Sequence, residues 1–465
     1  MNSHNIAKVL LSISICALLT GCDNKVVPIQ ENDINTDIQQ PAEDSEISDD
    51  LTKVTGAEDA VKENDEIKEE EQTEEDVSYE SVSNEYMGHT FKDGIVLPDI
   101  DTKQYILPEN EAISFINDLA VGINLGNTFD AYKDDGFSDE MKIEEYWQGV
   151  HTTPELIKYI HDLGFGTIRI PVSWHNHISD DVQISEQWLD RVEDVAHYAL
   201  DEGMYVIIDI HHDNHLKDVG IYPDRAHLEQ SKHYISRIWT QIGERFADED
   251  EHLIFEGMNE PRLVGHENEW EFNNAKDDCV EAAECINELN QTFVDTVRSL
   301  GGNNASRYLM CPGYTASVGG AFNPWFKLPK DNGGYDNRII LSIHAYTPYN
   351  FALEYPGVKT FDYTDKSSTS DIDVFMSKLY TEYIYKGIPV IIGEFGARNK
   401  EGNLKDRVDY AAYFTATARS RGIPVIWWDN NEFNGSGENF GIVNRRDPDN
   451  STFEIIAALM KYKDR

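Results

Sequence analysis

Cysteine and positive charge are both scarce in this sequence. Of its 465 residues only five are Cys, and 39 Lys and Arg face 85 Asp and Glu, which gives a formal net charge of -46. The charge argues against nucleic acid or other polyanions as partners, whereas a neutral polymer is compatible with it. After Cys22 only Cys279, Cys285 and Cys311 remain, without a CxxC spacing, so neither a disulfide framework nor a zinc site is indicated. Cys279 and Cys285 either form one small loop or stay free thiols.

The apolar run at the N-terminus is too short to span a bilayer as a stable helix. One Lys precedes the run Val9–Leu19, an arrangement typical of a secretory signal. Its end, Leu19-Thr20-Gly21-Cys22, resembles a bacterial lipobox, which implies a lipoprotein signal peptide over 1–21 and lipidation of Cys22; a plain signal peptide is the alternative. We expect a lipid anchor that holds the protein to the extracellular face of a bacterial cell membrane, or to the outer cell surface.

Aromatic residues are nearly missing from residues 22–85, where acidic side chains greatly outnumber Lys. Such a segment buries too little apolar surface to offset the entropy lost on ordering. We therefore predict a disordered acidic linker that acts as a spacer, with a docking segment for a partner as the alternative.

Residues 86–465 alternate short apolar runs with amphipathic stretches, as expected for one large domain. The predicted strands are Val121–Leu125, Thr167–Val172, Tyr205–Ile210, Leu253–Met258, Tyr308–Cys311, Ile339–Ile343, Pro389–Ile392 and Pro424–Trp427. The predicted helices are Pro154–Leu163, Glu186–Glu202, His233–Phe246, Val280–Leu300, Asp371–Tyr385, Leu404–Arg421 and Thr452–Tyr462. Continuous Val, Ile and Leu content indicates strands covered on both faces and paired in parallel. The pattern predicts an α/β fold, a (β/α)8 TIM barrel, over a doubly wound open sheet.

Two carboxylates follow or end predicted strands, Glu260 in Asn259-Glu260-Pro261 and Glu394 in Gly393-Glu394-Phe395. The carboxyl ends of barrel strands are where such barrels keep their chemistry. Two carboxylates across that opening are the minimum set for cleaving a glycosidic bond, one as acid and one as nucleophile or base.

Polar and aromatic residues also end most of the other predicted strands. His211, His212, Asp213 and His215 form one cluster of this kind, and its imidazoles and carboxylate are possible zinc ligands. Because neighbouring strand residues point to opposite sides, we favour hydrogen bonding over metal binding for this cluster. We expect no metal and no cofactor.

Six motifs occur in the order found in glycoside hydrolase family 5, which the sequence resembles over residues 116–463. They are Gly122-Ile123-Asn124-Leu125-Gly126-Asn127, Thr167-Ile168-Arg169-Ile170-Pro171-Val172, Ile210-His211-His212, Asn259-Glu260-Pro261, His344-Ala345-Tyr346 and Gly393-Glu394-Phe395-Gly396. The opening motif and Trp427-Trp428-Asp429-Asn430 look most like its endo-β-1,4-glucanases, many of which also cut xyloglucan.

The resemblance implies roles for individual residues. Glu260 is expected to be the general acid and base, and Glu394 the nucleophile. Arg169 and Tyr346 are expected to hold Glu394 charged, and His344 to lie beside Glu260. The remaining expected sugar contacts are Asn259 to the 2-hydroxyl, Trp428 as the stacking platform, His211 and His212 at the same sugar, and Asn127 and Asp130 at the next subsite. Four aromatic residues of the predicted rim, Trp174, Trp325, Tyr349 and Tyr355, either extend the cleft or only pack in loops.

The function indicated is a retaining endo-β-1,4-glucanase acting on cellulose, mixed-linkage β-glucan or xyloglucan, and we expect a monomer. A mannanase or xylanase on the same barrel is one alternative. A surface glycan-binding protein without catalysis is another, but the presence of Glu260 and Glu394 together with Arg169 and Tyr346 argues against it.

Overall fold

A computed structural model describes residues 84–465 except 215–218, 336 and 436. The predicted signal peptide, Cys22, most of the acidic linker and His215 lie outside the described residues. The described part belongs to one unit, Ser78–Arg465. Within it, Cys279, Cys285 and Cys311 are free and buried.

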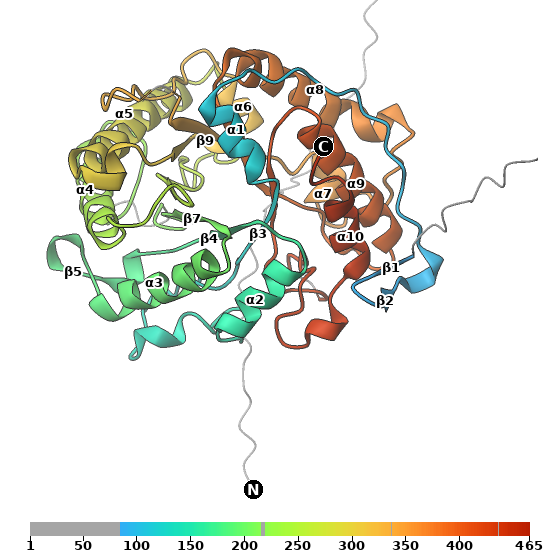
Figure 1. Ribbon diagram of the computed structural model, residues 1–465. Helices are drawn as coiled ribbons and strands as arrows, with labels where there is room; N and C mark the ends of the chain where they lie inside the picture. Colours follow the sequence, from blue (N-terminus) through green and yellow to red (C-terminus); the bar gives the residue numbers. More distant parts are fainter. Residues whose placement is uncertain (1–83, 215–218, 336, 436) are drawn as a thin grey trace, which may run out of the picture. The chain divides into compact units, whose positions relative to one another are not determined.

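Eight parallel strands form a closed barrel (Figure 1). They are β3 (Val121–Asn124), β4 (Thr167–Ile170), β7 (Tyr205–Asp209), β8 (Leu253–Glu256), β9 (Leu309–Ser317), β10 (Ile339–His344), β11 (Val390–Phe395) and β12 (Val425–Trp427). Each neighbour in sequence is a neighbour in the barrel, and β12 closes on β3. The predicted (β/α)8 barrel and its eight strands are confirmed, although β9 continues well past its predicted end at Cys311.

Helices surround the barrel in alternation with its strands. They are α1 (Glu111–Asp118), α2 (Pro154–Asp162), α3 (Glu186–Asp201), α4 (Leu228–Arg245), α5 (Asp277–Ser299), α6 (Val318–Ala321), α7 (Tyr349–Ala352), α8 (Lys366–Glu382), α9 (Leu404–Arg419) and α10 (Phe453–Lys461). Two small hairpins, β1 (Glu85–Tyr86) with β2 (His89–Thr90) and β5 (Ile178–Ser179) with β6 (Gln183–Ile184), lie outside the barrel sheet. None of the helices in the described part is long and apolar enough to cross a membrane.

Three helices, α4, α5 and α8, begin earlier than predicted, and α4 illustrates why. The polar residues Glu229, Gln230 and Ser231 hide the apolar periodicity of the first turn of α4, which begins at Leu228 rather than near His233. Ser231 is nevertheless buried, and its hydroxyl accepts the backbone N–H of Tyr222. The first turn therefore buries Leu228 by apolar packing and Ser231 through a hydrogen bond.

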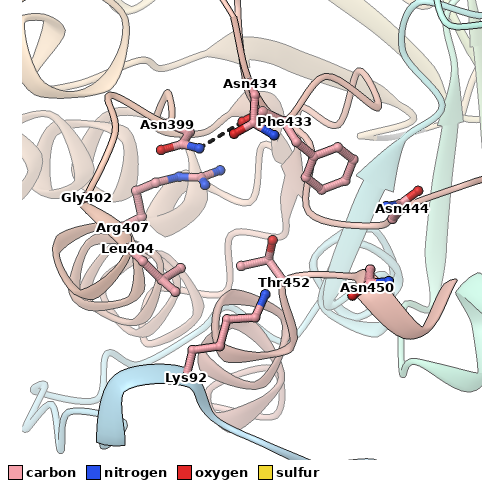
Figure 2. A pocket seen from close by; sticks show the side chains of 10 residues that line it. All are labelled: Lys92, Asn399, Gly402, Leu404, Arg407, Phe433, Asn434, Asn444, Asn450 and Thr452. Atoms are coloured by element: carbon pink, nitrogen blue, oxygen red, sulfur yellow. Dashed lines mark hydrogen bonds between the residues drawn. The ribbon is translucent and has the colours of Figure 1, made fainter. Parts of the chain in front are cut away.

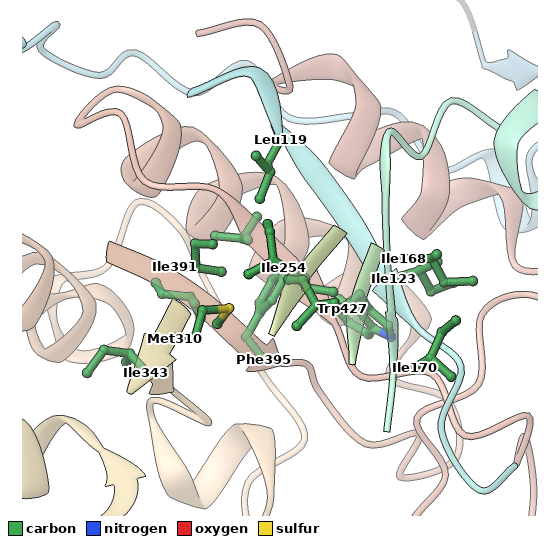
Figure 3. Close-up of a cluster of buried hydrophobic side chains, with 14 of the residues drawn as sticks. Leu119, Ile123, Ile168, Ile170, Ile254, Met310, Ile343, Ile391, Phe395 and Trp427 are labelled. Atoms are coloured by element: carbon green, nitrogen blue, oxygen red, sulfur yellow. The ribbon is translucent and has the colours of Figure 1, made fainter. Parts of the chain in front are cut away.

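Apolar side chains fill the space between strands and helices, and Figure 3 shows part of this cluster. In β4, Ile168 and Ile170 alternate with Arg169, so Arg169 points to the opposite face of the strand. All three side chains are completely buried. This alternation places a charged group inside the barrel, where it meets side chains from the other strands.

Candidate active site

Glu260 and Glu394 lie at the same end of the barrel, where its strands finish. Glu394 is in β11, and Glu260 follows the end of β8. One carboxyl oxygen of each lies within 4.8 Å of the other and of a ring nitrogen of His344. Nδ1 of His344 is 2.9 Å from Glu260 Oε1 and 3.6 Å from Glu394 Oε2. The fold thus gathers two carboxyls and an imidazole from three different strands or strand ends.

Arg169 connects this cluster to the rest of the barrel interior. Its guanidinium donates to Glu256 Oε2 (2.6 Å), Asn124 Oδ1 (3.0 Å), Glu394 Oε1 (2.8 Å), Asp209 Oδ2 (2.7 Å) and Asn259 Oδ1 (2.7 Å). Burial disfavours the charge of Arg169, but the three carboxylates outweigh burial and raise its pKa. A permanently charged, fully hydrogen-bonded guanidinium is what a buried carboxylate needs to stay ionised.

Glu394 is held by two fixed donors. Arg169 Nη1 donates to Oε1 and the Tyr346 hydroxyl donates to Oε2, each at 2.8 Å. Burial raises the pKa of Glu394, while His344, Arg169 and the Tyr346 hydrogen bond act in the lowering direction. The ion pair expected from the sequence is present, but burial still sets the direction of the shift.

Glu260 has a different environment. His344 lies 2.9 Å away, and Arg262 Nη1 lies 3.9 Å from Oε2. Burial raises the pKa of Glu260, against the lowering effects of Arg262 and Arg169. Since the pKa values of both carboxyls move upward, the hydrogen-bond donors rather than the direction of the shift distinguish the two groups.

The amide of Asn259 is oriented by the same guanidinium. Its Oδ1 accepts Arg169 Nη2 at 2.7 Å, which leaves Nδ2 as the free donor end of the side chain. Asn259 directly precedes Glu260 and is 3% exposed. Nδ2 is therefore available to a ligand hydroxyl beside the carboxyl pair.

Of the two neighbouring tryptophans, Trp428 lies in the cleft and Trp427 lies in the core. The Trp428 ring is parallel to His211, with centroids 5.7 Å apart and an interplanar angle of 1°, and retains 7% exposure. Trp427 is completely buried, contacts Phe395 and donates Nε1–H to the Phe440 carbonyl. Trp428, not Trp427, is thus the ring available as a platform.

A second group of side chains joins His211, His212 and Asp130. Their ligand atoms lie within 4.8 Å of one another, because both histidines lie beyond the end of β7 at Asp209. The argument that strand alternation keeps these two imidazoles apart is therefore wrong. His211 Nδ1 is engaged by Asp209 Oδ2 at 2.7 Å, and burial raises the pKa of Asp130 to about 7.

Other predicted residues lie at varying depth. Asn127 is half-buried, with a positive φ of 58°. Trp174 is completely buried and donates Nε1–H to the Asp209 carbonyl, so it does not extend the cleft surface. Tyr349 and Tyr355 are exposed, at 58% and 56%, whereas Trp325 is half-buried beside Phe272.

Sequence reasoning missed two site residues. Glu256 accepts both Arg169 and the Ser342 hydroxyl, the latter at 2.5 Å, inside the barrel. Its signal was an acid within a run of buried apolar residues. Arg262 donates to the Glu260 carbonyl, and its guanidinium lies 3.9 Å from the centre of the Trp270 ring, which is 59% exposed. No spacing rule pointed to this pair.

Known proteins resemble the chain in both sequence and structure. Residues 129–434 match the family model described as cellulase (glycosyl hydrolase family 5). Endoglucanase B of Neocallimastix patriciarum is 42% identical over 347 residues, which cover 73% of this chain and 68% of the relative. A family 5 lichenase from Caldicellulosiruptor sp. F32 is 50% identical with a TM-score of 0.78, over 79% of this chain and all of that one. A GH5-4 broad specificity endoglucanase from Ruminococcus champanellensis with bound cellotriose is 41% identical with a TM-score of 0.69, over 77% of this chain and 100% of that one.

Proposed function

Because the chain belongs to glycoside hydrolase family 5, we propose that it is a retaining endo-β-1,4-glucanase that cuts cellulose, mixed-linkage β-glucan or xyloglucan. The observation that carries the proposal is the approach of Glu260 and Glu394 oxygens to within 4.8 Å. Inverting enzymes keep their carboxyls about 6.5–9.5 Å apart to admit a water molecule, whereas retaining enzymes keep them about 5–5.5 Å apart. The pair fits direct attack by one carboxylate.

In the first step, Glu394 attacks the anomeric carbon. The bond from that carbon to the leaving oxygen breaks, and Glu260 gives this oxygen its proton. Arg169 and Tyr346 orient Glu394 for attack through their two 2.8 Å hydrogen bonds. Burial favours the protonated form of Glu260, as a general acid requires.

In the second step, Glu260 has become a carboxylate and takes a proton from water. The water oxygen attacks the anomeric carbon and releases Glu394, so two inversions give net retention. Burial lowers the pKa of His344, which favours a neutral imidazole beside Glu260.

The sugar at the cleavage subsite would be held by groups around this pair. Nδ2 of Asn259 donates to the 2-hydroxyl, a contact that strengthens as the oxocarbenium-like state forms. Trp428 supplies the apolar face, with His211 and His212 on the same sugar. Asn127 and Asp130 serve the next subsite.

We also propose that Cys22 anchors the enzyme at the cell surface, a proposal supported by the lipobox-like segment and the run before it. Expression of the chain and of Cys22→Ala in a bacterial host, with labelled palmitate, tests this. We expect label and membrane association only with Cys22; equal association of both forms would refute it.

Product analysis tests the catalytic proposal. The wild type should release reducing ends and mid-sized oligosaccharides from carboxymethylcellulose, mixed-linkage glucan and xyloglucan, and Glu394→Gln should lose activity by more than about a thousandfold. Release from mannan or xylan alone would instead favour the alternative specificity. Wild-type rates in Glu394→Gln would overturn the assignment of the nucleophile.

A further inference from the structure

A second cavity, the Arg407 pocket, lies away from the two carboxyls. It has a volume of about 390 Å³ and opens between the segment that follows β11, the segment that follows β12 and the N-terminal segment (Figure 2). Its lining residues are Lys92, Asn399, Gly402, Leu404, Arg407, Phe433, Asn434, Asn444, Asn450 and Thr452. None of these ten residues contacts Glu260 or Glu394 in the candidate active site, and none is acidic.

The charge of Arg407 in this pocket lacks a counterion of its own. Arg407 is 3% exposed, and within the described part of the chain its guanidinium donates one hydrogen bond, from Nε to the Ala397 carbonyl. Nη2 is buried there without an acceptor. Asp429 is the charged group that acts on it, but that carboxylate is already bound by Arg445 at 2.8 Å.

Other buried guanidiniums of the chain have more hydrogen-bond partners than Arg407. Arg169 meets three carboxylates. Arg419, on the same helix as Arg407, donates from Nε to the Lys463 carbonyl and from Nη2 to Asn117, so two of its nitrogens are bonded although its Nη1 is buried without an acceptor. Burying a cation without such partners costs free energy. An anion that enters the cavity would supply the missing acceptor for Arg407.

The surroundings of Arg407 reinforce positive potential. Figure 2 shows its guanidinium directed into the cavity, with the Lys92 ammonium entering from the N-terminal segment. The first turn of α9 contributes Leu404, and Asn403 before it makes no side-chain cap, since its Oδ1 accepts the N–H of Lys400 instead. The positive end of the helix dipole therefore also faces this space.

The rest of the lining matches a small polyhydroxylated body. Asn399 is already bonded at both ends of its amide, but Nδ2 of Asn444, Oδ1 of Asn450, the amide of Asn434 and the Thr452 hydroxyl offer neutral donors and acceptors, and Phe433 offers one apolar ring face. The volume lies within the range of small-ligand sites. In barrels of this fold, oxyanion sites recur at the loops after the seventh and eighth strands, which here are β11 and β12.

We propose that the Arg407 pocket binds a small sugar that carries an oxyanion, a sugar acid or a sugar phosphate, with the oxyanion on Arg407 and Lys92 and the hydroxyls on the amides. This site is independent of the catalytic cleft. Glu454, which accepts the backbone N–H of Lys92 at 2.6 Å, is not part of the lining and leaves the cavity free of carboxylates. Because the whole chain carries a net charge of -46, binding of an anion here depends on these local groups.

Isothermal titration of the full-length chain with glucuronate, glucose 6-phosphate and glucose tests the proposal. We expect at least one anionic sugar to bind, and binding to weaken by about tenfold or more in Arg407→Gln, because charge-assisted hydrogen bonds are lost. Which of the two anions binds identifies the source of the oxyanion.

Arg419→Gln is the matched control, since it removes a buried guanidinium from the same helix outside the pocket and should leave binding unchanged. Should Arg407→Gln fail to fold, Lys92→Ala at an exposed position provides the second variant, with weaker binding expected. No binding of either anion, wild-type affinity in Arg407→Gln, or equal affinity for glucose would overturn the proposal.

Discussion

Nδ1 of His344 lies 2.9 Å from Oε1 of Glu260. A neutral imidazole nitrogen either accepts a hydrogen bond or donates one, according to the tautomer. It is therefore able to accept from Glu260 when this carboxyl is protonated, and to donate when it is ionised. The pairing suits a group that must act first as an acid and then as a base.

Replacement of Glu260 separates its role from that of the nucleophile. Glu260→Gln should lose most activity on β-glucan, by about 10²–10⁴-fold, because the leaving oxygen is no longer protonated. On an aryl glycoside with a good leaving group, the first step should be largely retained. Steady-state rates on both substrates measure this, and equal losses on the two would contradict an acid role.

Arg262 should set the alkaline limit of activity. It acts to lower the pKa of Glu260, so Arg262→Gln should raise that pKa. Glu260 must be protonated to act as an acid, and activity is lost as pH rises through its pKa. The alkaline limb of the kcat/KM profile should therefore move to higher pH, by up to about one unit.

Arg446→Gln, at an exposed position of the segment after β12, is the control for this profile. Its alkaline limb should coincide with that of the wild type. If the alkaline limb of the Arg262→Gln profile moved to lower pH instead, Arg262 would not act by lowering the pKa of Glu260.

Replacement of Trp428 should mainly reduce activity, whereas replacement of Trp427 should mainly reduce stability. Trp428→Ala should lower kcat/KM on glucans about tenfold or more through loss of the stacking face, with a modest fall in thermal stability. Trp427→Ala should cost about 3–5 kcal/mol of folding free energy, because a completely buried ring leaves a cavity. Thermal unfolding and steady-state kinetics of both variants check this; the reverse pattern would exchange their roles.

Asp130 should make stability depend on pH. Its pKa, about 7 in the folded protein, is raised from 3.8 by burial, so the folded state holds its proton over a range where the unfolded state has lost it. The buried carboxyl of Asp130 therefore does not lower the free energy of unfolding below pH 3.8. It lowers this free energy progressively as the pH rises, and the full loss is reached above about pH 7.

Asp130→Asn removes this loss and keeps an oxygen for the Thr128 N–H. The variant should gain in unfolding free energy over the wild type at pH 8, by no more than about 4 kcal/mol, with a smaller gain at pH 5. Denaturant unfolding at both pH values measures it. Asp135→Asn, at an exposed position, should show no such trend.

Apolar periodicity was sufficient to predict the barrel. A short apolar run such as Ile339–Ile343 predicts a buried strand once the segments on both sides of it show helical periodicity. The strands were therefore predicted correctly, even where their predicted ends were not. The start of α4 was predicted too late because Ser231 is buried through a hydrogen bond with Tyr222 and not by apolar packing. A buried polar residue of this kind leaves little trace in hydrophobic periodicity.

Site residues such as Glu394 could be predicted because a sequence motif places them at the end of a strand. Residues whose side-chain direction depends on tertiary packing were harder to predict. Nothing in the pair Trp427-Trp428 indicates which ring enters the core. The positions of His211 and His212 depended on where β7 stops, because strand alternation no longer applies beyond Asp209. Such boundaries are set by tertiary contacts.

The five acceptors around Arg169 have a consequence for folding. Its bond to Glu394 spans 225 positions of the chain and its bond to Asn124 spans 45, so the cluster forms only when distant strands are together. Barrel closure and catalytic competence should then arise in one event. Partly folded chains should be inactive, and the recovery of activity during refolding should report directly on the closed barrel.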